Sequence, residues 1–172
     1  LVDIGLTDAI VDVAAGQADV AIRFGPLADS PLMARKLGES GRVIVASPEY
    51  LKRFGTPQTP EDLHDHNCLN FNFRRAEPVW PFCRQGENYA MNVSGNIEAN
   101  NGETLGQLAA AGVGIARVGA FSVAAEIEQG RLVPLLESYN PQDTEEIHAV
   151  FAGGANMPAR ARVFVDFLAE ML

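Results

Sequence analysis

The sequence predicts an α/β protein with two lobes, between which the chain crosses twice. Strand and helix signals alternate in the first part, a long block of further signals follows, and one strand and one helix close the chain. Turn-rich segments near residues 38–42 and 138–146 flank the middle block and suit connectors. If the two ends share a sheet, residues 1–39 with 143–172 form lobe I and residues 40–142 form lobe II.

The first lobe is predicted to begin with a strand, a helix and a second strand. The alternation in Leu1–Gly5 indicates a strand, Thr7 suits the N-cap of a helix that ends at Gly16, and Asp19–Gly25 is an apolar run. A helix between two strands predicts a βαβ unit and hence a parallel sheet. Because the chain starts in mid-sheet without an initiator Met, we interpret it as a fragment whose N-terminal part is absent.

The second lobe is predicted to start with a strand over residues 42–46, after a preceding strand at 32–38 and a break at residues 39–41. Ser47, Pro48 and an acid then give the start signals of a helix that stops before residue 56. Further signals predict strands and short helices at 68–73, 80–84, 89–93, 97–100, 121–127 and 132–135.

One stretch, Asn100–Val118, reads as a turn, a short helix and a buried strand. The first turn of such a helix has unpaired N–H groups and the positive end of the helix dipole, so it could accept an anion. Glu103 sits where it would complement the dipole and repel a carboxylate, which favours neutral contacts from Asn101 and Thr104. The alternative is an ordinary turn that binds nothing.

A strand at 147–152 and an amphipathic helix are predicted at the end of the chain. Apolar side chains recur there at spacings of three and four: Phe164, Phe167, Leu168, Met171 and Leu172.

Composition excludes several classes of protein. The net charge is −9, and the 13 Lys and Arg residues are scattered, which argues against a nucleic-acid surface. The chain shows no leader and no apolar run near the roughly 20 residues that cross a bilayer, so we expect a cytoplasmic protein without a membrane partner. The two cysteines are expected to be reduced and buried.

Metal binding and catalysis are not predicted. His64, His66 and Cys68 offer groups that bind zinc, but their spacing is not a standard pattern and no fourth ligand is evident. Ser47 lacks a G-x-S-x-G setting, and the glycines within residues 112–119 do not form a nucleotide-binding loop. We therefore expect no enzyme activity, no metal and no cofactor.

A series of motifs in register carries a resemblance to a known family. The motifs are D-V-A-I-R-F-G-P-L-A-D-S-P-L-M-A-R-K-L-G (Asp19–Gly38), V-A-S-P-E-Y-L (Val45–Leu51), T-P-E-D-L with H-N-C-L (Thr59–Leu69), W-x-F (Trp80, Phe82), N-N-G-E-T-L with A-A-G-V-G-I, and G-R-L-V-P-L (Gly130–Leu135). In this order they resemble the effector-binding domain of LysR-type transcriptional regulators, and the resemblance covers essentially the whole chain.

The resemblance implies two Rossmann-like lobes of type II periplasmic-binding-protein architecture, with a small-molecule effector between them. It also implies that a DNA-binding helix-turn-helix and the first strand and helix of lobe I are missing here. DNA would be bound only through that absent domain, and the full-length protein would be a homodimer or homotetramer. The alternative is a stand-alone periplasmic-type solute-binding protein.

Three segments are expected to face the effector. They end the strand of lobe I, end a strand of lobe II and start the helix of lobe II: Ile22, Arg23, Phe24 and Gly25; Asn70, Phe71, Asn72 and Phe73; and Asn101, Gly102, Glu103 and Thr104. Arg23 could clamp a carboxylate, or could form a structural ion pair with Asp19, Asp29 or another acid at the hinge.

Overall fold

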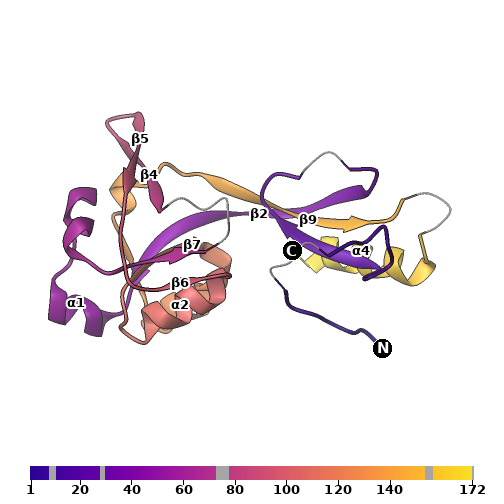
Figure 1. The fold of residues 1–172 in the computed structure, drawn as a ribbon, viewed down its shortest axis with the longest axis horizontal. Helices are drawn as coiled ribbons and strands as arrows, with labels where there is room; N and C mark the ends of the chain where they lie inside the picture. The colour runs from indigo at the N-terminus through magenta and orange to yellow at the C-terminus, as the bar shows by residue number, and fades with distance from the viewer. Residues whose placement is uncertain (8–10, 28–29, 73–77, 154–156, 172) are drawn as a thin grey trace. The chain divides into compact units, whose positions relative to one another are not determined.

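The computed structural model describes residues 1–7, 11–27, 30–72, 78–153 and 157–171 (Figure 1). The chain forms two compact units. Unit 1 comprises Leu1–Ser40 and Thr144–Leu172, and unit 2 comprises Gly41–Asp143.

Unit 1 is built on an antiparallel pair of strands covered by one helix. Strand β1 (Val20–Phe24) pairs with β9 (Thr144–Phe151), with Val20 opposite Phe151 and Phe24 opposite Ile147. Strand β2 (Met33–Ala46) follows β9 in the sheet. The parallel βαβ arrangement predicted for this part is therefore wrong at β1, because its partner comes from the far end of the chain and runs in the opposite direction.

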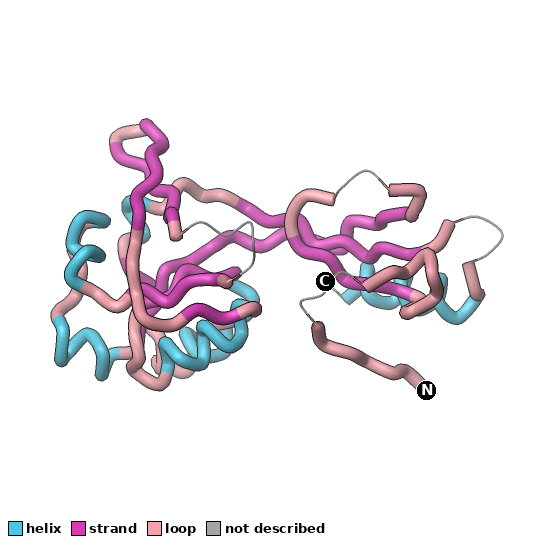
Figure 2. Tube along the Cα trace, in the orientation of Figure 1, coloured by secondary structure: helices cyan, strands magenta, loops and turns pink. Residues whose placement is uncertain are grey.

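The predicted first strand and helix are wrong as well. Residues 1–7 have no regular structure (Figure 2). The side chains of Leu1, Ile4 and Leu6 are exposed. A strand needs a neighbour to satisfy its backbone groups, and no strand of the described residues pairs with this segment. Residues 13–16 form turns rather than a helix, and the carboxylate of Asp12 accepts the N–H of Ala15, a local bond that competes with helix formation. Residues 8–10 lie outside the described residues.

Strand β2 is continuous, so the predicted break at residues 39–41 is also wrong. It supplies residues 33–40 to unit 1 and residues 41–46 to unit 2. Gly38 and Gly41 are not among the glycines with positive φ. Their backbone is therefore compatible with an extended strand, and a glycine alone does not end one.

The helix α4 (Ala159–Met171) confirms the predicted C-terminal helix, but the face that it buries differs. Ala161 and Val165 are its fully buried residues, whereas Phe167 and Met171 are 53% and 68% exposed. Val165 packs with Leu37 of β2 and with β9 to form the core of unit 1. The helix is therefore amphipathic as predicted, but its buried face contains Ala161 and Val165 rather than Phe167 and Met171. Leu172 lies outside the described residues.

Unit 2 is organised around a mixed sheet in the order β2-β7-β3-β6. Strand β7 (Ile115–Gly119) runs antiparallel to β2 and parallel to β3 (Cys68–Phe71), and β3 runs parallel to β6 (Glu98–Ala99). Strand β8 (Val133–Leu135) also pairs with β2. The other elements are α1 (Pro48–Phe54), η1 (Pro60–Asp65), the hairpin β4 (Val79–Arg84) and β5 (Glu87–Asn92), α2 (Gly102–Ala110), η2 (Ala120–Ser122), α3 (Ala124–Glu128) and η3 (Glu137–Tyr139).

The sheet of unit 2 separates two apolar cores. One core contains Cys68, Tyr50 of α1, and Trp80 and Phe82 of the hairpin. The other contains Leu69 together with residues of α2 and β7 such as Leu105 and Val118. Because side chains alternate along a strand, successive residues of β3 face different cores, and this alternation decides how the candidate site is built.

Local capping signals are confirmed. The hydroxyl of Ser47 accepts the N–H of Tyr50 at 3.2 Å at the start of α1, which has Pro48 in its first turn. At the start of α2 the Asn101 side chain accepts the N–H of Thr104 at 2.8 Å, a cap that was not predicted. Cys68 is buried and Cys83 is half-buried, and both are free thiols. Among the described helices, none is long and apolar enough to span a membrane.

Candidate functional site

The end of β3 and the start of α2 meet at Phe71 and Gly102. A Cβ atom on Gly102 would lie 3.8 Å from Cζ of Phe71 and 3.6 Å from the hydroxyl of Ser122. The edge of the Phe71 ring is therefore in van der Waals range of the first helical residue. Two of the three predicted segments are thus brought together within unit 2.

The first turn of α2 keeps the character expected of a helix start. The Asn101 side chain caps it by accepting the N–H of Thr104. The N–H groups that precede Thr104 in the helix have no intrahelical acceptors, as at any helix start. Glu103 is exposed, and its carboxylate accepts a hydrogen bond from the side chain of Gln107, one turn later, at 3.4 Å. This arrangement favours the interpretation of Glu103 as a complement to the helix dipole.

One residue of this neighbourhood, Arg42, was not predicted from the sequence. Its guanidinium carbon lies 6.0 Å from the centroid of the Phe71 ring, a cation–π distance, and its backbone pairs with Gly119 across β2 and β7. No local pattern marks Arg42, because the contact joins two strands that are distant in sequence. The site therefore combines an aromatic ring, a cation and a helix start.

Asn70 does not share the environment of Phe71, because alternation turns its side chain to the other face of β3. Its Oδ1 accepts a hydrogen bond from Nε1 of Trp80 at 3.1 Å, and its Nδ2 donates to the Cys68 carbonyl at 3.2 Å. Asn72 is exposed and donates its N–H to the Ala99 carbonyl at 3.1 Å. Phe73 lies outside the described residues. The side-chain amide of Asn70 is therefore engaged within the protein.

The lobe I segment lies in unit 1 at the end of β1. Ile22 and Phe24 are 41% and 48% exposed, and Gly25 has φ +81° and donates its N–H to the Glu146 carbonyl at 2.9 Å. Arg23 donates to the Val11 carbonyl at 3.0 Å.

The predicted ion-pair partner of Arg23 is otherwise occupied. Asp19 pairs with Arg160, so the Arg23–Asp19 alternative is wrong. Asp29 lies outside the described residues. Across the strand pair, Arg23 lies opposite His148, whose Nδ1 is buried without a hydrogen-bond partner among the described residues.

Of the two histidines and the cysteine near η1, His66 and Cys68 take structural positions, whereas His64 is exposed. Nδ1 of His66 lies 3.2 Å from the hydroxyl of Tyr50, and the thiol of Cys68 donates to the Leu63 carbonyl at 3.7 Å. Burial raises the pKa of Cys68 to about 12 and lowers the pKa of His66. The Cys68 thiol is thus protonated at neutral pH, a poor state for binding a metal. No cluster of three candidate metal ligands occurs in the part of the chain that the structure describes.

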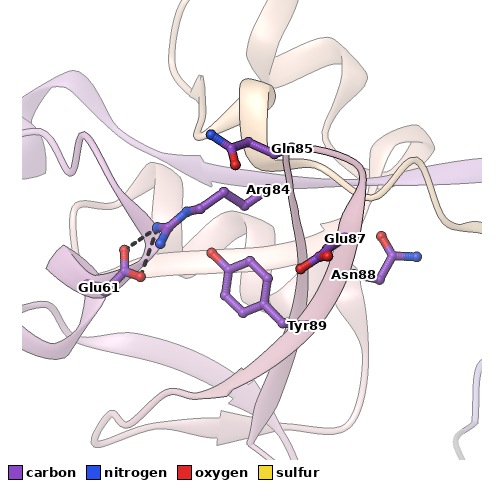
Figure 3. Close-up of a pocket in the computed structure, with 6 residues that line it drawn as sticks. All are labelled: Glu61, Arg84, Gln85, Glu87, Asn88 and Tyr89. Carbon is purple, nitrogen blue, oxygen red and sulfur yellow. Dashed lines mark hydrogen bonds and ion pairs between the residues drawn. The ribbon is translucent and has the colours of Figure 1, made fainter.

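A hollow of about 360 Å³ opens elsewhere in unit 2, beside the hairpin, and contains none of the predicted site residues (Figure 3). Arg84 crosses it, with Nη2 2.8 and 2.7 Å from the two carboxylate oxygens of Glu61 and its guanidinium over the rings of Tyr89 and Tyr139. Its lining is otherwise polar, which is unusual for a small-molecule site. We therefore place the candidate site at Phe71 and α2.

Comparison with known proteins identifies relatives of this chain. The family model for the LysR substrate binding domain matches residues 2–172. The HTH-type transcriptional regulator CrgA of Neisseria meningitidis serogroup C (strain 8013) is 37% identical over 167 residues, which cover 96% of this chain and 55% of that protein. The HTH-type transcriptional activator AaeR of Escherichia coli (strain K12) is 31% identical, over 92% of this chain and 51% of its own length.

Solved structures give the same result. The regulatory domain of CrgA from Neisseria meningitidis matches with a TM-score of 0.88 and 36% identity, over 96% of this chain and 81% of that one. The full-length Vibrio cholerae virulence activator AphB matches with a TM-score of 0.79 and 26% identity, over 98% of this chain and 57% of that one. The chain spans about half the length of the curated relatives it matches.

Proposed function

The chain belongs to the LysR substrate-binding domain family, and from this premise we propose that it senses a small-molecule effector for a transcriptional regulator. The relatives are transcriptional regulators rather than enzymes or solute carriers, and a solved regulatory domain has the same fold. These similarities support the regulator over a stand-alone solute-binding protein.

The observation that carries the proposal is the meeting of Phe71, Arg42 and the start of α2. The Phe71 ring can pack against an aromatic or apolar effector, and Arg42 can attract a carboxylate. The N–H groups at the helix start add donors, while Glu103 opposes a second negative charge. This combination supports a small aromatic or organic acid with a single carboxylate as the effector.

Contacts from unit 1 remain part of the proposal. Residues 22–25 are predicted to complete the site from the end of β1, with the half-exposed Phe24 as an apolar contact. This role stays a prediction.

The proposed mechanism is a shift in population between two states of the domain. An effector that binds one state better shifts the equilibrium toward it, and a coupling free energy of about 1 to 3 kcal/mol is typical of such linkage. In the whole protein this shift would alter how a helix-turn-helix domain outside the chain meets DNA. The acidic net charge of −9 supports a division of labour in which this domain does not bind DNA itself.

The whole regulator would work in the cytoplasm, where bacterial DNA lies, as a homodimer or homotetramer. A two-fold symmetric assembly would present paired helix-turn-helix domains to a pseudo-palindromic operator. Gel-shift titration of the full-length protein with its own promoter region, with and without effector, tests this part of the proposal.

Calorimetric titration with a panel of benzoate, 4-hydroxybenzoate, succinate and citrate tests the site. We expect a monocarboxylate to bind, and Phe71→Ala and Arg42→Gln each to weaken that binding by about tenfold, or about 1.4 kcal/mol. Phe54→Ala is the control, because Phe54 is an exposed phenylalanine of α1 in the same unit. Equal affinity in the wild type and in both site variants would show that the effector binds elsewhere.

A further inference from the structure

The hydrogen bond between Trp80 and Asn70 ties the hairpin to the strand that carries the candidate site. Nε1 of Trp80 lies 3.1 Å from Oδ1 of Asn70, and the two residues are 6% and 7% exposed. Trp80 belongs to β4, and Asn70 is the last residue of β3 before Phe71. A buried amide oxygen that lost this donor would remain unsatisfied, which is costly away from water.

Three hydrogen bonds fix the position of Asn70. Its side-chain amide accepts from Trp80 and donates to the Cys68 carbonyl, and its backbone N–H donates to the Ile97 carbonyl at 3.2 Å. Two residues later the N–H of Asn72 donates to the Ala99 carbonyl at 3.1 Å. Of these bonds, only the one to Trp80 reaches the hairpin.

The Asn70–Trp80 bond also links two successive strands, β3 and β4. Strand β3 ends at Phe71 and β4 begins at Val79, so the Asn70–Trp80 bond joins the next-to-last residue of β3 to the second residue of β4. It therefore ties the end of β3 to the start of β4. Because Phe71 follows Asn70 directly and faces the other side of β3, any slip of Asn70 would turn the Phe71 ring away from Gly102.

We propose that Trp80 is a positioning residue of the effector site, acting through Asn70 to hold the end of β3 so that Phe71 stays against the start of α2. This inference rests on the proposed function, because the site that Trp80 would position is the proposed effector site. Trp80 contacts the core on the hairpin side of the sheet, and its effect on the effector is exerted through the strand.

Amide hydrogen exchange measured by NMR tests the proposal without any ligand. Trp80→Phe keeps an aromatic ring and removes the N–H donor. We expect the amides of Asn70 and Asn72 to exchange about fivefold faster in this variant, which corresponds to one lost hydrogen bond. The amide of Ile115 in β7, which donates to the Asn67 carbonyl, should keep its rate.

Tyr89→Phe is the matched control in the same hairpin. The hydroxyl of Tyr89 has no hydrogen-bond partner among the described residues, so its removal should leave every one of these rates unchanged. A uniform increase across Asn70, Asn72 and Ile115 in Trp80→Phe would show a purely structural role and overturn the proposal. Unchanged rates in Trp80→Phe would also overturn the proposal. So would a faster exchange of Asn70 and Asn72, with Ile115 unchanged, in Tyr89→Phe.

A second measurement separates this inference from the proposed function. Benzoate is titrated into the wild type, Trp80→Phe and Tyr89→Phe, and we expect the Kd to rise about fivefold in Trp80→Phe only. If Phe71→Ala leaves benzoate binding intact while the exchange pattern holds, the proposed site is wrong and the support of β3 by Trp80 stands. Normal exchange in Trp80→Phe together with loss of binding in Phe71→Ala would refute the support of β3 by Trp80 and leave the proposed site standing. If benzoate does not bind, the exchange rates decide alone.

Discussion

The hydroxyl of Tyr50 lies 3.2 Å from Nδ1 of His66 and accepts the backbone N–H of Asn67 at 3.0 Å. Tyr50 comes from α1, whereas His66 and Asn67 lead from η1 into β3. The phenol is buried, and burial raises its pKa, so it stays protonated and can both donate and accept. One hydroxyl thus fixes the entry of the chain into the strand that carries the candidate site.

Replacing Tyr50 by Phe should lower the free energy of unfolding by about 1 to 3 kcal/mol, because the N–H of Asn67 and the ring of His66 would both lose their partner. Urea unfolding followed by circular dichroism measures the loss. Tyr139→Phe is the control, since the Tyr139 ring packs beside Arg84 and no described residue hydrogen-bonds its hydroxyl. Equal stability of Tyr50→Phe and the wild type would contradict the proposed importance of this network.

Stability should also depend on pH through His66. Burial lowers the pKa of His66 below its ordinary 6.5, an effect that outweighs the nearby carboxylates of Asp65 and Asp62, which raise it. As the pH falls through about 6.5 the unfolded chain takes up a proton that folded His66 does not bind. The unfolded state therefore binds more protons, and the free energy of unfolding decreases below that pH until folded His66 also becomes charged.

Urea unfolding at a series of pH values between about 7.5 and 5 measures this dependence. In His66→Gln the slope should be smaller, because the substituted amide does not titrate, while His64 and His148 remain in both proteins. The carboxylate of Asp62, whose pKa is lowered by the backbone N–H groups of Thr59 and Gln58, loses its contribution only at lower pH. Identical slopes in the two proteins would rule out His66 as the source.

Much of unit 2 could be predicted from sequence because its signals are local. The cap at Ser47 and the proline at the start of α1 each depend on a few adjacent residues. The capping side chain of Asn101 is of the same kind. Each of these features is determined by residues that are adjacent in sequence, so it can be recognised from the local sequence alone.

Unit 1 was harder to predict because its pairing is non-local. Nothing near Val20–Phe24 reveals that the partner is β9, more than a hundred positions away, and the strand direction follows from that partner. The alternation in Leu1–Gly5 predicted a strand, yet these residues have no regular structure and no described strand pairs with them. A pattern of side chains does not make a strand unless a neighbour supplies the hydrogen bonds.

The candidate site was predicted only in part, because some of its contacts also join residues that are distant in sequence. Phe71 and Gly102 meet as expected from the ends of their elements, whereas Asn70 faces the opposite core. Because side chains alternate along β3, Asn70 and Phe71 face opposite sides of the sheet. The sequence does not reveal which side each residue faces, because that depends on where the hairpin packs. Arg42 carries no local signal at all, since it reaches Phe71 across the sheet.

Gly114 gives the last prediction, which concerns the motif A-A-G-V-G-I between α2 and β7. A Cβ atom on Gly114 would lie 2.3 Å from the carbonyl oxygen of Asn67, the same oxygen that accepts the N–H of Ile115. The Asn67 side chain donates to the Val113 carbonyl at 2.8 Å, so this backbone cannot move away without breaking its bonds to Val113 and Ile115. Gly114 is therefore required by the close approach of β3 and β7.

We expect Gly114→Ala to lower the free energy of unfolding by about 3 kcal/mol, at the upper end of the range for overpacked sites. Gly38→Ala is the matched control, because a Cβ there meets nothing within 4 Å and its φ is not positive, so its stability should stay within about 0.5 kcal/mol of the wild type. Thermal and urea unfolding of both variants measure the difference. Should Gly114→Ala prove as stable as Gly38→Ala, the contact between Asn67 and Gly114 would not be tight enough to set the spacing of β3 and β7.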